Sequence, residues 1–322
     1  MSLYRHKSGL LFIALFALLA LFQANPVSAS SGIARSIRRP HALGTRQHAH
    51  SHNSSSLPLE YNNGPVMRQT SITYAIFWEP ATLQDGTPTR VSANYHGLIE
   101  RYFADIGGSG IYSVNTQYYD GGGSITNSSS FGGAWVDTSA YPSSDCNDSA
   151  TPNDCMSDGQ FQLEVLKAMQ ANGWSGGLNH MFFVFTSLGE GSCVDTASSA
   201  CSFTQYCAYH SAFQSSDGQT VIYANMPYAG TSLDGCGVSF SPNNDIDADS
   251  TINVLSHEHM EAVTDPLGNA WYDALGDEIG DKCAWNFGSL NSSGGDVTFN
   301  GHSYILQKEW DNKAKGCVLT GP

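Results

Sequence analysis

The amino-acid sequence predicts an α+β fold in which a mixed sheet is packed against helices and held by disulfides. Short alternating or apolar runs, typical of strands, lie among longer segments of helical periodicity, without a strict strand–helix–strand order. Eight cysteines, an even number, favour a disulfide framework. Residues 61–322 contain no second linker and no internal repeat, so we expect them to form a single domain.

Residues 1–29 have the pattern of a secretory signal peptide. Arg5, His6 and Lys7 precede the apolar run GLLFIALFALLALF, and NPVSAS follows, with cleavage expected after Ala29. The run is too short for a membrane span, and nothing later in the chain is long enough to be one. We therefore expect a secreted, extracellular protein with no membrane anchor after signal cleavage.

Residues 30–60 are expected to be a disordered basic linker or pro-segment. Residues 30–57 contain no acid and almost no apolar periodicity. Four arginines make the segment basic: Arg35, Arg38, Arg39 and Arg46. His48, His50 and His52 could hold a metal weakly, although a solvated polar tail is the simpler interpretation. A further hypothesis is that the basic segment lies across the cleft of the acidic domain as an inhibitor.

The rest of the chain is strongly acidic. Loss of Arg5 and Lys7 with the signal peptide takes the net charge from −15 to −17, because no acidic residue is lost with them. Such a charge excludes nucleic-acid binding through phosphate contacts.

The first half of the domain predicts two helices and two strands. Residues 71–78, SITYAIFW, alternate and are rich in β-branched and aromatic side chains, so they predict a strand. Helical spacing of apolar residues follows over 91–106 and stops at Gly107-Gly108. Residues 118–133 are rich in Gly and Ser and predict turns and irregular strands. A second helix is expected over 160–173 and an apolar central strand over 180–186.

The second half predicts one further strand, a long helix and a short tail. Residues 219–228 form an apolar run of strand length. Asp249 or Ser250 is the expected cap of a helix that ends at Pro266, because proline cannot donate to the preceding turn. Residues 302–320 are expected to form one or two short strands anchored by Cys317.

Export to an oxidising compartment makes disulfides the expected state of the cysteines. The expected pairs are Cys146 with Cys155, Cys193 with Cys201, Cys207 with Cys236, and Cys283 with Cys317. The first two pairs close short loops, but the sequence alone leaves the connectivity open.

The stretch SHEHMEAVTDP (256–266) carries the residues that predict chemistry. His257 and Glu261 are four positions apart on a helix, so they project from one face and can share one ion. Glu258 lies about 100° around the helix axis from His257, where its carboxylate is expected to reach a metal-bound water rather than the metal. This is the His-Glu-x-x-His helix of zincins with glutamate as the second ligand, and glutamate oxygen is an acceptable zinc ligand. The alternative is that these residues are only the polar face of a helix. His259 points away from the His257 face and is expected either to support the ligands from behind or to lie on the surface.

A catalytic zinc site needs a third protein ligand. In GDEIGDKC, Glu278 is the expected third ligand, and Asp281 an outer carboxylate that orients His257, with the reverse assignment also open. His210 is the candidate for electrophilic help in catalysis, with Tyr223 and Tyr272 as alternatives. These residues predict a zincin-like fold and a secreted Zn²⁺-dependent hydrolase. We expect a peptidase acting on a peptide or protein substrate, with Glu258 as general base toward a metal-activated water.

The block SPNNDIDADSTINVLSHEHMEAVTDPLGNAWYD, followed by DEIGDKCAWNFG, resembles a group of secreted microbial proteins. It is similar, more distantly, to the plant exordium or phosphate-induced protein 1 family. Other matching stretches, such as GPVMRQTSITYAIFW and VIYANMPY, extend the resemblance over most of residues 64–290. It implies an alternative function: a non-catalytic extracellular or cell-wall-associated protein, with a cell-wall component as partner and a structural or vestigial metal site. A third hypothesis is carbohydrate binding by aromatic, glycine-rich loops such as YYDGGG.

Overall fold

The structure is a computed structural model of the 322-residue chain, and it describes residues 35–36, 41–49 and 57–322. The predicted signal peptide, residues 1–29, lies outside the described residues. Within the described part, no helix combines the length and the apolar character needed to cross a bilayer.

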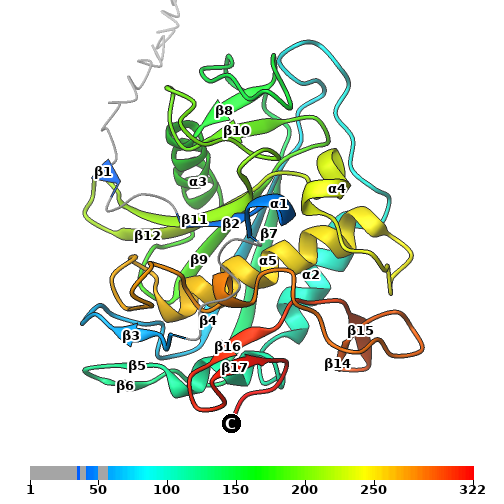
Figure 1. The fold of residues 1–322 in the computed structure, drawn as a ribbon. Helices are drawn as coiled ribbons and strands as arrows, with labels where there is room; N and C mark the ends of the chain where they lie inside the picture. Colours follow the sequence, from blue (N-terminus) through cyan, green and yellow to red (C-terminus); the bar gives the residue numbers. More distant parts are fainter. Residues whose placement is uncertain (1–34, 37–40, 50–56) are drawn as a thin grey trace, which may run out of the picture. The chain divides into compact units, whose positions relative to one another are not determined.

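A seven-stranded mixed sheet forms the centre of the fold (Figure 1). In spatial order its strands are β1 (Arg35–Ser36), β11 (Tyr206–Gln214), β12 (Thr220–Met226), β9 (His180–Phe185), β4 (Ser71–Trp78) and β7 (Ser129–Asp137), and β2 (His41–Gly44) also pairs with β11. Strands β12, β9, β4 and β7 are parallel, whereas β11 is antiparallel to β12, β1 and β2. The sheet is therefore mixed, as the sequence predicts, and β4, β9 and β12 are the three predicted strands.

Helices cover both faces of this sheet and bury two separate cores. Helix α2 (Tyr95–Asp105) and helix α5 (Ile246–Thr264) contribute to one core, and helix α3 (Asp158–Asn172) to the other. Strand β4 shows the division, because Ala75 and Phe77 point into the first core and Tyr74 and Ile76 into the second.

Helix α5 is buried along nearly its whole length, from Ala248 to Thr264. It begins at the cap Asp245, whose carboxylate accepts a hydrogen bond from the backbone N–H of Ala248 at 3.1 Å. The prediction of Asp249 or Ser250 as the cap is wrong by about one turn, because an upstream aspartate makes the capping bond. The helix ends at Thr264, two residues before Pro266.

Short elements fill the remaining chain. The two-stranded sheets are β3 (Glu60–Tyr61) with β13 (Trp271–Tyr272), β5 (Tyr119–Asp120) with β6 (Gly123–Ser124), β8 (Cys155–Ser157) with β10 (Gly191–Cys193), β14 (Val297–Phe299) with β15 (His302–Tyr304), and β16 (Glu309–Asp311) with β17 (Gly316–Val318). The short helices are α1 (Arg46–Ala49), α4 (Leu233–Cys236), η1 (Tyr112–Gln117), η2 (Ala229–Ser232) and η3 (Asp281–Cys283).

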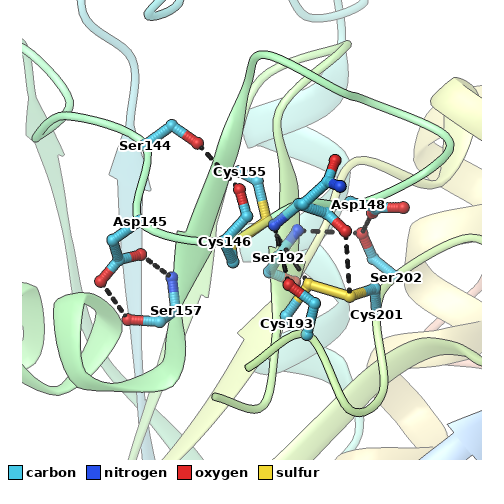
Figure 2. Close-up of a disulfide and its surroundings, with 12 residues drawn as sticks. Ser144, Asp145, Cys146, Asp148, Cys155, Ser157, Ser192, Cys193, Cys201 and Ser202 are labelled. Atoms are coloured by element: carbon cyan, nitrogen blue, oxygen red, sulfur yellow. Dashed lines mark hydrogen bonds between the residues drawn. A yellow bond between two sulfur atoms is a disulfide. The ribbon is translucent and has the colours of Figure 1, made fainter. Parts of the chain in front are cut away.

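All four predicted disulfides are present: Cys146–Cys155, Cys193–Cys201, Cys207–Cys236 and Cys283–Cys317. The first two lie side by side at β8 and β10, with Sγ of Cys155 3.5 Å from Sγ of Cys193 (Figure 2). Beside them the Asp145 carboxylate accepts bonds from the backbone N–H and hydroxyl of Ser157, at 2.9 and 2.6 Å. Each bridge closes its own short loop, and the pairing of β8 with β10 holds the two loops together. No cysteine is left as a free thiol.

The structure differs from the sequence prediction in three segments. Strand β7 begins within the glycine-rich stretch predicted as turns and irregular strands, and it continues as a nine-residue strand of the central sheet. Its residues alternate between half-buried and exposed, as at a sheet edge. Strand β11 is a nine-residue element that the sequence analysis does not predict. The third segment is 41–49, within the predicted disordered linker. It forms β2 and α1, because strand addition to β11 relies on backbone hydrogen bonds and needs no apolar periodicity.

Candidate metal site

Three parts of the chain bring the candidate ligands together beneath the sheet. Helix α5 supplies His257, Glu258 and Glu261, strand β11 supplies His210, and the loop 278–283 supplies the acids beyond the proline. All three helix side chains are completely buried. The site is therefore assembled by long-range packing rather than by the helix alone.

The loop 278–283 is held against α5 by main-chain and covalent contacts. The backbone N–H of Asp281 donates to Oε1 of Glu261 at 3.0 Å, and Trp310 N–H donates to the carbonyl oxygen of Ile279 at 3.0 Å. The Cys283–Cys317 disulfide closes the end of the loop. Gly280 sits so close to the imidazole that an added Cβ would lie 2.5 Å from Nδ1 of His257. A glycine is required here for close approach, not for its backbone angles, since its φ is −80°.

One group of candidate ligands consists of His257, Glu261 and Asp281. A donor atom from each lies within 4.8 Å of the others. Nε2 of His257 is 3.0 Å from Oε1 of Glu261 and 3.7 Å from Oδ1 of Asp281. Despite the short distance, Nε2 has no hydrogen-bond partner among the described residues, so it is not aligned on the carboxylate as a donor. The atoms instead surround a common point.

A second group lies on the other side of Glu261 and consists of His210, Glu258 and Glu261. Nδ1 of His210 is 3.2 Å from Oε2 of Glu258 and 3.7 Å from Oε2 of Glu261. Nε2 of the same ring is 3.7 Å from Oε2 of Glu278. Glu261 is thus shared by both groups, one oxygen facing each.

Gln307 supports the imidazole of His257 from behind. Its amide nitrogen lies 2.9 Å from Nδ1 of His257 and 3.0 Å from the carbonyl oxygen of Gly280. In this orientation the amide donates to Nδ1, so the proton of the neutral ring is on Nε2. A metal on Nε2 requires the opposite tautomer, with the amide oxygen of Gln307 turned to accept from Nδ1.

Burial and mutual repulsion raise the pKa values of the carboxyl groups in the cluster. Burial raises the pKa of Glu258 to about 8, although His257 and the Leu43 N–H favour the ionised form. Burial raises the pKa of Glu261 to about 8, and the charge of Glu258 is the second largest cause of this rise. The pKa values of Glu278 and Asp281 are raised well above their ordinary values by burial and by Glu261. Several acids in one dry cluster form a place where a divalent cation replaces protons.

Access to this cluster is narrow. Asp281 keeps 19% of its side chain exposed, whereas the side chains of His257 and Glu261 are 0% exposed. On the sheet side the backbone N–H of Leu43, in β2, donates to Oε1 of Glu258 at 3.3 Å. Strand β2 therefore covers the catalytic candidate.

The predicted site residues are largely gathered in one place. His210, His257, Glu258, Glu261, Glu278 and Asp281 all lie in the two groups or in contact with them. Asp281 lies with His257 and Glu261, whereas Glu278 lies against His210, which favours the second of the two assignments that the sequence left open. Tyr223 is excluded from the site, because its hydroxyl donates to Asp158 in the core beneath α3. Tyr272 is half-buried in β13.

His259 is neither a ligand nor a surface residue. It is completely buried among aromatic rings, and its Nε2 lies 3.2 Å from Oγ of Ser71. Burial lowers its pKa to about 3. Of the two expected positions the one on the surface is wrong, because this side of α5 faces the sheet.

Two residues near the site have no sequence signal of their own. Gln307 and Glu309 lie in the tail, which the sequence marks only as short strands. Glu309 is completely buried, and its pKa is raised well above its ordinary value by burial and by the charges of Glu261 and Asp281. Only the fold shows that the tail returns to α5.

Two plant proteins are similar to part of this chain. Protein EXORDIUM-like 5 of Arabidopsis thaliana is 34% identical over 106 residues, which is 27% of this chain and 29% of that protein. Protein EXORDIUM-like 3 of the same plant is 36% identical over 101 residues, which is 26% of this chain and 29% of that protein. The chain therefore matches less than a third of the length of these relatives. No family model matches the chain. No solved structure matches it either.

These similarities support the resemblance to exordium-like proteins for about a quarter of the chain, a shorter stretch than the expected 64–290. The four disulfides are compatible with an extracellular protein.

Proposed function

We propose that the protein is a secreted zinc-dependent hydrolase, with His257, Glu261 and Asp281 as zinc ligands and Glu258 as general base. The observation that carries this proposal is the unaligned pair His257 and Glu261. The facing atoms, Nε2 of His257 and Oε1 of Glu261, are 3.0 Å apart and buried, yet Nε2 has no hydrogen-bond partner among the described residues. Leaving such an imidazole nitrogen unpaired in a dry interior is costly, and a cation bound to it removes the penalty.

The spacing of the donor atoms fits a zinc ion. Ligands at 2.0–2.2 Å in tetrahedral geometry lie about 3.3–3.6 Å from one another. The distances of 3.0 and 3.7 Å from Nε2 of His257 to Glu261 and Asp281 fall on either side of this range. One nitrogen and two carboxylate oxygens form an ordinary zinc donor set, with a fourth position left for water.

The chain's own residues supply the acid–base chemistry. A bound zinc ion would lower the pKa of water and polarise a carbonyl group. Glu258 is one position from the ligand His257, and its carboxylate can take a proton from a water beside the ligands. His210 holds that carboxylate in place through Nδ1, at 3.2 Å from Oε2. In this arrangement His210 is a positioning residue for the base.

Metal analysis of the purified full-length chain tests the proposal. We expect one zinc per chain by mass spectrometry, lost in Glu261→Gln and Asp281→Asn. Glu258→Gln should retain zinc and lose hydrolysis of a protein probe such as casein. Glu164→Gln is the matched control, because Glu164 is a buried carboxyl in contact with Lys167, away from the site, and this variant should retain both.

Two results would contradict the assignment. A folded wild-type protein that binds no zinc, manganese or other divalent ion by equilibrium dialysis removes the metal site. Loss of zinc in Glu258→Gln, with retention in Asp281→Asn, moves the ion to the group of His210, Glu258 and Glu261 and removes Glu258 as the base.

The second candidate function is a non-catalytic extracellular or cell-wall-associated protein of the exordium type. The similarity to the two EXORDIUM-like proteins favours it, as does the complete burial of the helix ligands. It predicts no hydrolysis by any variant. It also predicts either a metal that only stabilises the fold or metal-free protein of undiminished stability.

A further inference from the structure

The edge of the central sheet next to the candidate site is occupied by an N-terminal strand. Strand β2 is antiparallel to β11, with Ala42 opposite Tyr209 and His41 opposite His210. His210 is the β11 residue that contacts Glu258, so β2 runs directly past the candidate base. Figure 1 shows β2 between β11 and α5.

The two described side chains at the centre of β2 face opposite sides of the strand. Leu43 is completely buried in the core that contains α5, and its N–H is the donor to Glu258. Ala42 borders a pocket of about 480 Å³ together with Val194, Ala200 and Tyr206. The strand therefore places an aliphatic side chain beside the site and a small one at a cavity with room for a larger group.

Polar contacts clamp the chain immediately after β2. The carbonyl oxygen of Gly44 accepts from the indole N–H of Trp285 at 3.0 Å, and Thr45 N–H donates to Gln205 at 3.2 Å. Arg46 donates to the carbonyl oxygen of Gly237, and its guanidinium lies 5.2 Å from the centre of the Trp285 ring. Trp285 follows the acid-bearing loop, so one side of this clamp belongs to the same segment as the candidate ligands.

We propose that the edge of β11 beside α5 and Trp285 is a binding site for an extended polypeptide, and that residues 41–44 occupy it in cis. The ligand adds a strand to β11, presents an aliphatic side chain at the position of Leu43, and places one backbone N–H on Glu258. One consequence of this inference rests on the proposed hydrolase function: the chain's own strand blocks the binding of a polypeptide substrate. The strand-addition site itself requires neither metal nor catalysis.

Strand addition gives affinity through main-chain hydrogen bonds and selectivity through alternate side chains. A substrate competing for this edge therefore needs a run of residues free of proline, because proline lacks the N–H that pairs with the sheet. The cis segment has a high effective concentration, so a peptide added in trans binds only when the cis contacts are weakened.

Peptide binding to full-length protein tests the inference directly. The probe is a fluorescein-labelled peptide of residues 40–47, PHALGTRQ. We expect it to bind the double variant Leu43→Pro/Arg46→Ala at least tenfold more tightly than wild type by fluorescence anisotropy. Gln47→Ala, at an exposed position, is the matched control and should behave as wild type. A peptide with proline in place of the leucine should not compete.

Equal or absent binding to wild type and a cooperatively folded double variant overturns the proposal. If the double variant does not fold, Arg46→Ala alone is measured by hydrogen exchange of the peptides spanning 41–44 and 206–214. Faster exchange in both segments, reversed by added PHALGTRQ, supports the cis strand, and unchanged exchange overturns it.

The two proposals fail in different ways. Peptide binding by a variant that holds no zinc removes the hydrolase and retains the strand-addition site. If wild type and the double variant both bind zinc and hydrolyse casein at equal rates, and neither binds the peptide, the hydrolase is retained and the strand-addition site is removed.

Discussion

The side-chain amide nitrogen of Gln307 lies 2.9 Å from Nδ1 of His257, although 50 residues separate them in the chain. The partner on the second imidazole nitrogen fixes the orientation and tautomer of a metal-ligating histidine. Gln307 therefore controls whether Nε2 of His257 can face an ion.

Gln307→Leu is expected to weaken zinc binding by about 10–100-fold, as for other residues that support a ligand from behind. The conservative variant Gln307→Glu, whose carboxylate accepts from Nδ1, should restore most of the affinity. Competition with a fluorescent chelator measures the effect. Gln162→Leu is the control, because Gln162 is buried in the other core and bonds Asp158. Equal affinities for the two leucine variants would contradict the prediction.

Gly280→Ala is expected to destabilise the fold by about 1–3 kcal/mol, since overpacking a closed site forces its neighbours to move. The new methyl group would lie 2.5 Å from Nδ1 of His257. Gly159→Ala is the matched control, because no heavy atom lies within 4 Å of an added Cβ there and the residue is in α3. Urea unfolding measures both variants. A stability for Gly280→Ala equal to wild type would show that the loop can retreat from His257.

Removal of the Cys283–Cys317 disulfide is expected to lower both stability and zinc affinity. The bridge closes a separation of 34 residues and fastens the loop that carries Asp281, and such bridges contribute about 2–4 kcal/mol. The double variant Cys283→Ser/Cys317→Ser should lose zinc at lower chelator concentrations than wild type. Cys193→Ser/Cys201→Ser, far from the ligands in sequence, should lose stability with unchanged zinc affinity. Equal zinc affinity in both double variants would show that the Cys283–Cys317 disulfide does not support the metal site.

Glu190 should make the protein less stable as the pH rises. Burial raises its pKa from the ordinary 4.5 to about 8. The hydrogen bond from Gln84 opposes this rise, and the charges of Asp154 and Asp85 add to it. Above pH 4.5 the unfolded chain releases this proton while the folded chain keeps it. The contribution of Glu190 to the free energy of unfolding therefore falls by about 1.4 kcal/mol per pH unit until about pH 8.

Glu190→Gln does not titrate, so its stability relative to wild type should rise from pH 4.5 to pH 8. Urea unfolding at the two pH values measures the difference. The exposed Glu60 provides the control Glu60→Gln, whose unfolding should follow wild type. Parallel behaviour of Glu190→Gln and wild type across this pH range would mean that Glu190 is ionised in the folded protein.

Several features of this fold are local enough to be predicted from sequence. The strands at 71–78 and 180–186 and the helix carrying His257 are marked by their own periodicity. The four disulfides also agree with the pairing expected from the order of the cysteines. The gathering of His257, Glu261 and Asp281 follows from a short spacing on one helix and a nearby loop.

The remaining features depend on partners that are distant in the chain. Strand β11 contains Tyr, Cys, His and Ser among its apolar residues, because it packs between two cores and against α5, and its composition does not identify it as a strand. Strand β2 is stable only as an addition to β11. Gln307 has no motif, and only the return of the tail to α5 brings it to His257.

The pairing of β2 with β11 sets an order of assembly during synthesis. Just after β2, the hydroxyl of Thr45 contacts the carbonyl oxygen of Thr204, which is 159 residues further along the chain. Strand β2, which leaves the ribosome early, must therefore wait until most of the sheet has been made, because distant pairings form late and slowly. Helix α5 and the loop 278–283 follow β11 in the chain, so β2 can already be paired before the acidic cluster beside it is complete.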